Sequence, residues 1–156
     1  AAEMAEADKP AAEIIAEIEK MRFEMNHIFT VDTLEYLWRG GRVTRAEAFV
    51  GNVLDIKPIL HILDNGRITA FHKVRDRKKA LQFIADWVFD TSGGLEGQTI
   101  GVVHWDCEKD ALDMAARLKE TCSPKDIIIA KMSATIGVHT GPGLLGVVFQ
   151  NEAGRR

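Results

Sequence analysis

Residues 138–143, with the sequence VHTGPG, combine the side chains and turn formers that suit an anion-binding site. Two glycines on either side of a proline predict a tight turn after a strand, with backbone N–H groups that can point outward. His139 and Thr140 add two side-chain hydrogen-bond donors at the same strand end. A carboxylate or phosphate needs several short, converging donors of this kind. The segment therefore predicts an anion-binding turn. A purely structural turn, in which His139 forms its hydrogen bonds with neighbouring groups, fits the same residues.

Basic residues are concentrated in one part of the chain. Between Arg39 and Lys79 there are ten basic and four acidic residues, although the whole chain carries a formal net charge of −3. This asymmetry predicts a face that meets an anion or an acidic partner, while solvated surface residues of an average domain are the other interpretation. Arg75 and Arg77 lead into a predicted helix start, where cations oppose the helix dipole. That local conflict favours a functional role for these cations.

Other residues that often carry chemistry form no recognisable pattern. Cys107 and Cys122 lack the spacing of a zinc site or a redox pair. No serine has a GxSxG setting, and no glycine motif for nucleotide phosphates is present. Aromatic residues make up 7% of the chain and do not interleave with the basic ones, which disfavours nucleic-acid binding. Four histidines lie in predicted strands without metal-ligand spacing: His27, His61, His72 and His104. We therefore expect no catalytic residue, no metal and no cofactor.

Hydrophobic periodicity predicts the elements that must position these residues. Asp32 is expected to cap a short helix that stops at Gly40-Gly41, and Thr44 with Glu47 forms a capping box ahead of a helix to residue 54. Asn65-Gly66 predicts a hairpin in which both residues take positive φ. The remaining predicted helices are residues 10–25, 78–89 and 108–121. The predicted strands are residues 26–31, 57–63, 67–74, 98–105, 126–131 and 145–150.

These elements predict an α/β fold with a mixed β-sheet packed against helices. The hairpin contributes antiparallel pairing, whereas the strand, helix and strand between residues 98 and 131 predict a parallel pair with a right-handed crossover. The 156 residues, 46% of them hydrophobic, suffice for one ordinary domain. No apolar run approaches the roughly 20 residues of a membrane-spanning helix. The first ten residues do not have the pattern of a signal peptide, so we expect a cytoplasmic protein.

Three segments, in this order, resemble the C-terminal half of the DegV family of bacterial fatty-acid-binding proteins. They are TLEYLWRGGRVTRAEAFVGNVLDIKPIL (33–60), the hairpin followed by KVRDRKKAL (73–81), and GVHTGPGLLGVVF (137–149). The resemblance covers nearly the whole chain. Two departures are Asp76, where the family often has glycine, and Trp38, where a basic residue is common.

The resemblance implies that residues 1–156 form the second, lipid-binding domain of the DegV fold, without the family's N-terminal α/β domain. It implies a long-chain fatty acid held in a tunnel between the two domains. A kinase subunit that binds ATP then phosphorylates the carboxylate to an acyl phosphate, so this chain is a non-catalytic carrier. His139, Thr140, Gly141 and Gly143 would bind the ligand. Four arginines would dock the kinase: Arg42, Arg45, Arg75 and Arg77.

Two other functions remain open from the residues themselves. A regulatory or interaction domain could recognise an acidic protein partner through the basic segment. A small phosphotransferase could use His139 as a phosphate acceptor.

Overall fold

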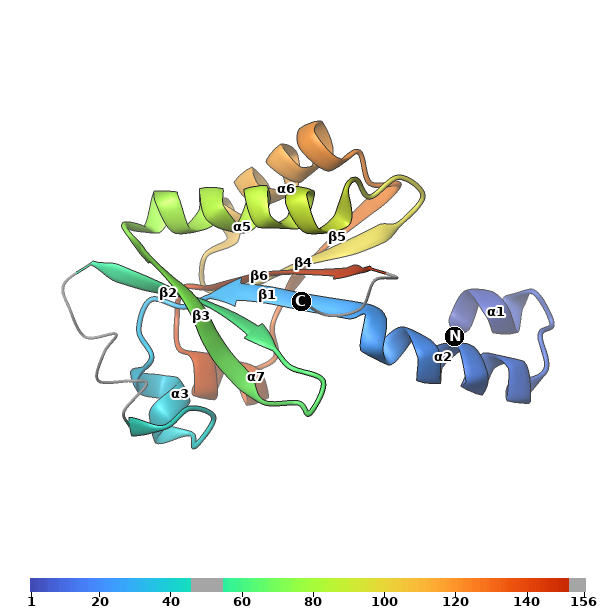
Figure 1. Cartoon of the computed structure of the whole chain (residues 1–156), viewed down its shortest axis with the longest axis horizontal. Helices are drawn as coiled ribbons and strands as arrows, with labels where there is room; N and C mark the ends of the chain where they lie inside the picture. Colours follow the sequence, from blue (N-terminus) through green and yellow to red (C-terminus); the bar gives the residue numbers. More distant parts are fainter. Residues whose placement is uncertain (46–54, 152–156) are drawn as a thin grey trace.

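A computed structural model describes residues 1–45 and 55–151 and contains one mixed six-stranded sheet (Figure 1). The strand order is β3-β2-β1-β6-β4-β5. β4 and β5 pair in parallel, and the other neighbours pair antiparallel. The strands are β1 (Met25–Thr30), β2 (Ile56–Ile62), β3 (Ile68–Arg75), β4 (Thr99–Trp105), β5 (Asp126–Lys131) and β6 (Leu144–Gln150). The predicted α/β class and mixed sheet are confirmed.

Helices lie on both faces of this sheet. α5 and α6 cover one face, whereas the short helices α3 and α7 lie against one end of the other face (Figure 1). α1 and α2 precede β1 and extend away from the sheet. The helices are α1 (Ala2–Glu6), α2 (Ala11–Glu24), α3 (Glu35–Arg39), α5 (Arg77–Ser92), α6 (Glu108–Cys122) and α7 (Ala134–Thr140).

Within the described residues, the core consists of two apolar clusters, one on each face of the sheet. Strand residues alternate between the faces, so Ile28 of β1 packs with the α5 and α6 cluster and its neighbour Phe29 packs with the α3 cluster. The predicted apolar stripe of α6 is buried in the first cluster: Ala111, Met114, Ala115 and Leu118. Fully burying one such leucine or methionine side chain contributes about 1.5–3 kcal/mol.

The hairpin between β2 and β3 is confirmed, but its turn differs from the prediction. Only Gly66 of the Asn65-Gly66 pair has a positive φ, at 79°. The Gly66 N–H donates to Leu63 O at 2.8 Å, and the Leu63 N–H donates to Arg67 O at 2.9 Å. These bonds enclose a three-residue loop with a left-handed glycine at its last position, a common hairpin form.

Asp32 does not cap α3 as the sequence predicts. Leu34 occupies the N-cap position, and the Thr33 hydroxyl accepts a hydrogen bond from the Glu35 N–H at 3.2 Å. The Asp32 carboxylate instead pairs with the Lys57 ammonium at 3.1 Å. A cation that folding brings close is a better partner for a carboxylate than an exposed backbone N–H.

The helix expected from the Thr44 and Glu47 capping box to residue 54 lies outside the described residues, apart from Thr44 and Arg45. α5 ends at Ser92, within the Ser92-Gly93-Gly94 segment expected to stop it, and Gly93 caps it with a φ of 68° in the left-handed region. Within residues 1–45 and 55–151, no helix has the length and apolar character needed to cross a membrane.

Candidate functional site

His139 lies in the last turn of a helix and not in a turn after a strand. The Thr, Ile and Val residues around it favour a strand by propensity alone. Packing overrides that preference, because Gly137 lies directly against the indole of Trp105 on β4. A Cβ added at Gly137 would meet Trp105 Cε2 at 2.5 Å. α7 therefore sits on the sheet through its glycine and presents His139 at its C-terminal end.

The imidazole of His139 packs onto the backbone of Gly40. A Cβ at Gly40 would collide with Nδ1 of His139. Gly40 ends α3, so the RGGR segment and the HTGPG segment, almost a hundred residues apart, meet at this point. Because Gly40 has no side chain, the His139 ring can occupy this space.

Three of the predicted ligand-binding residues are packed into the protein. Thr140 is buried, and its hydroxyl donates to Ile136 O at 3.2 Å within α7. Gly141 lies under the ring of Tyr36, and Gly143 lies against the Asp32 carboxylate. His139 is half-buried, and its imidazole packs against Gly40. The glycines shape the site by allowing close approach.

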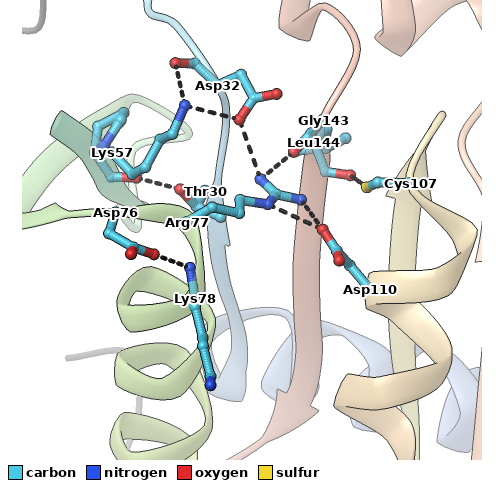
Figure 2. A network of polar contacts seen from close by, with 11 residues as sticks. Thr30, Asp32, Lys57, Asp76, Arg77, Lys78, Cys107, Asp110, Gly143 and Leu144 are labelled. Carbon is cyan, nitrogen blue, oxygen red and sulfur yellow. Dashed lines mark hydrogen bonds and ion pairs between the residues drawn. The ribbon is translucent and has the colours of Figure 1, made fainter. Parts of the chain in front are cut away.

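Arg77 forms the centre of a polar network beside this turn (Figure 2). Its Nε and Nη2 donate to Asp110 Oδ2 at 3.0 and 2.9 Å, and its Nη1 donates to Gly143 O at 2.6 Å. Asp32 Oδ1 lies 3.6 Å from the same Nη1. The Arg77 side chain is only 22% exposed. Its predicted position on an open surface is therefore not what the structure shows.

The start of α5 is compensated locally. Asp76 caps the helix by accepting a hydrogen bond from the Lys78 N–H at 2.6 Å. Together with the Arg77–Asp110 pair, this cap offsets the unfavourable cations in the first turn. The other three arginines predicted to dock a partner, Arg42, Arg45 and Arg75, are exposed. Their docking role stays a prediction.

Arg42 also lines a cavity that sequence reasoning did not indicate. The cavity has a volume of about 340 Å³ and lies between residues 41–44, after α3, and the turn of the β2–β3 hairpin. Arg67 lines it from the hairpin side. Two guanidinium groups therefore border one hollow beside α3.

Cys107 lies next to the network but has no sign of reactivity. Its thiol donates to Leu144 O at 3.0 Å (Figure 2). Burial raises the pKa of the Cys107 thiol above its ordinary value of 9.0, and the nearby Arg77 only partly opposes that shift. A protonated thiol is a poor nucleophile near neutral pH.

The sheet face next to α7 is partly open and apolar. Along β4 the residues on this face are Trp105, Val103 and Gly101, because Val102 and Ile100 point to the α5 and α6 side. Gly101 pairs with Ile128 of β5, and Ile128 is 57% exposed. This open face begins at the strand residue on which α7 packs.

Comparison with known proteins establishes the family. A profile of the DegV family, whose members it describes as uncharacterised proteins, matches residues 1–152. The chain belongs to the DegV family. This match agrees with the resemblance carried by the three sequence segments.

The chain spans about half the length of the DegV relatives that it matches. A DegV domain-containing protein of Streptomyces coelicolor is 40% identical over 153 residues, which are 97% of this chain and 54% of that protein. The structure of DegV from Bacillus subtilis, described as a fatty acid binding protein, is 36% identical with a TM-score of 0.76, over 94% of this chain and 52% of that one. The Streptococcus pneumoniae fatty acid kinase B3 protein, loaded with linoleic acid, shares the fold with a TM-score of 0.85 at 20% identity, over 95% and 52% of the two chains.

Sequence reasoning missed several residues that surround the candidate site of this DegV chain. Gly40, Asp32, Lys57 and Asp110 received no functional role from the sequence, yet they contact His139, Gly143 or Arg77, or pair with a residue that does. The alternation along β2 could have placed Lys57 on the same face as Ile59. No local signal connects Asp110 with Arg77, because the two lie on different helices.

Proposed function

We propose that this DegV chain is the C-terminal domain of a fatty-acid carrier. His139 holds the carboxylate of a long-chain fatty acid, and the open face of the sheet forms one wall of a tunnel. An N-terminal α/β domain supplies the other wall and further partners for the carboxylate. The observation that carries this proposal is a half-buried imidazole at the end of α7, the helix that packs through Gly137 on Trp105 of the apolar, partly open sheet face.

The order of residues along β4 supports a route for the acyl chain. α7 packs on Trp105, and the next residues of the same face are Val103 and Gly101. Gly101 and Gly146 have no side chains, so the sheet surface has more room for a ligand at these two positions. Each CH₂ group that leaves water contributes about 0.8 kcal/mol, so a dry tunnel over this face can hold a long chain tightly.

Exposed apolar residues on α2 support a second domain. Ile15, Ile18 and Phe23 are exposed on a helix that extends away from the sheet (Figure 1). The second domain of the proposed carrier would cover such residues. The DegV relatives are about twice as long as this chain, which is enough for a further domain.

The carrier presents its ligand to a kinase subunit in the cytoplasm. A carboxylate oxygen attacks the γ-phosphorus of ATP held by the kinase, ADP leaves, and an acyl phosphate forms. This chain performs no covalent step. The exposed Arg42, Arg45 and Arg75 supply positive charge for docking, which sets encounter rate and orientation more than ligand retention.

Lipid analysis tests the carrier function. This chain would be fused to the N-terminal half of the Bacillus subtilis DegV protein, and the purified chimera would be denatured and examined by mass spectrometry. Stoichiometric fatty acid supports the proposal, and a chimera that folds but retains no fatty acid, even after incubation with oleate, contradicts it.

Kinase turnover tests the docking role separately. In the chimera, Arg75→Glu is expected to slow acyl-phosphate formation, most strongly at low salt, without loss of bound lipid. Turnover equal to that of the parent chimera would show that Arg75 is not part of the docking surface.

A further inference from the structure

Arg77 connects four segments that are far apart in the sequence. It starts α5, pairs with Asp110 in the first turn of α6, lies near Asp32 after β1, and donates to Gly143 just before β6. Figure 2 shows the guanidinium between these groups. A planar group with five N–H donors can make such divergent contacts at once.

These contacts hold Gly143, which lies in the turn between α7 and β6. Gly143 accepts from Arg77 Nη1 at 2.6 Å, and its own N–H donates to Trp105 O at 2.9 Å. The Asp32 carboxylate lies against its Cα. Gly141 and Gly143 have φ values of 73° and 84°, conformations that glycine adopts freely and also leaves freely. Contacts from outside the turn are therefore needed to hold it in one conformation.

We propose that Arg77 is a positioning residue, which fixes residues 141–143 and thereby the end of α7 and the imidazole of His139. The link to lipid binding rests on the proposed function, in which His139 holds the carboxylate. The path is short: residue 143 is held by Arg77, residue 141 ends α7 under Tyr36, and His139 is two residues earlier.

The positive and negative charges around Arg77 balance one another. Asp32 and Asp110 face Arg77 and Lys57, so the network contains two acids and two bases. A lysine at residue 77 preserves this balance. Its single ammonium cannot reproduce the two bonds to Asp110 Oδ2 together with the bond to Gly143 O. Arg77→Lys therefore keeps the positive charge and removes the contacts that hold the turn.

Hydrogen exchange on the 156-residue chain tests the positioning directly. We expect Arg77→Lys to speed exchange of the Gly143 amide at least tenfold and to shift the NMR signals of the His139 ring. Amides of β4 and β6 in the core should keep their parent rates. The matched control is Arg117→Lys on α6, whose exposed guanidinium contacts Gln82 and lies outside the network. Unchanged Gly143 exchange, or an equal increase throughout the core, would overturn the inference.

A second variant protects the test against misfolding. Asp110→Asn leaves Arg77 in place with a weaker acceptor, and it should loosen the turn less than Arg77→Lys does. If Arg77→Lys does not fold, local loosening in Asp110→Asn supports the inference, and parent-like exchange overturns it.

Lipid affinity of the chimera distinguishes this inference from the proposed function. If the parent chimera binds oleate, we expect Arg77→Lys to weaken binding about tenfold while Arg117→Lys does not, and equal binding by both variants overturns the inference. If the parent chimera binds no fatty acid, the proposed function fails, and the exchange experiment still decides whether Arg77 positions the turn.

Discussion

The position of His139 depends on the lack of a side chain at Gly40. The imidazole occupies the space where a Cβ would be, so residue 40 sets how close the end of α7 comes to α3. The sequence could predict His139 as a candidate, because histidine beside a Gly-Pro-Gly segment stands out. It could not predict Gly40, since only folding brings the two residues together.

Gly40→Ala is expected to displace the His139 ring. Overpacking of this kind costs about 1–3 kcal/mol of folding free energy, and fatty-acid affinity of the chimera should fall as far as it does for His139→Ala. The matched control is Gly41→Ala, which adds a methyl group in open space, although the φ of 73° makes it strained. Calorimetric melting and lipid titration measure the two effects. Parent affinity in Gly40→Ala would show that the ring position does not matter for binding.

Cys107 provides a pH-dependent prediction. Burial raises the pKa of its thiol above 9.0 in the folded chain. The folded state therefore holds this proton more tightly than the unfolded state, and the resulting stability is present below pH 9 and is lost as pH rises through the folded pKa. At pH 8 we expect iodoacetamide to alkylate Cys107 more slowly than free cysteine, as measured by peptide mass spectrometry. Faster alkylation would contradict the assignment of a protonated thiol.

α7 is the element for which sequence propensity and structure disagree. Its β-branched residues predict a strand end, yet the chain forms two turns of helix on Trp105. Long, strongly periodic elements such as α5 and α6 were predictable, because their apolar faces repeat over several turns. A seven-residue helix has too few turns for such a repeat, so tertiary contacts decide its form.

Gly137→Ala tests the packing of α7 against the sheet. The added methyl group would meet the Trp105 indole, and we expect a loss of about 1–3 kcal/mol in the free energy of unfolding. Val138→Ala is the control on the same helix, since Val138 is 66% exposed and its truncation should change stability little. Urea denaturation compares the variants. Equal stability of Gly137→Ala and the parent would show that α7 can shift without cost.

At the scale of the whole molecule, the sheet brings the first and the last strand of the described chain side by side. β1 pairs with β6 from Met25 with Gln150 to Thr30 with Leu145, which places the strand after α2 at the centre of the sheet. Each strand could be predicted from its own residues, and the parallel β4–β5 pair followed from the helix between them. The order of the remaining strands was not predictable, because it depends on contacts between distant segments.

In the proposed carrier, fatty acid binds between this chain and a second domain. Titration with a fluorescent long-chain fatty acid, of the 156-residue chain alone and of the chimera with the Bacillus subtilis N-terminal half, tests it most directly. We expect the chimera to bind with submicromolar affinity and the chain alone about 100-fold more weakly, a difference of roughly 2.8 kcal/mol. Equal submicromolar affinity of the two proteins would contradict the tunnel between domains.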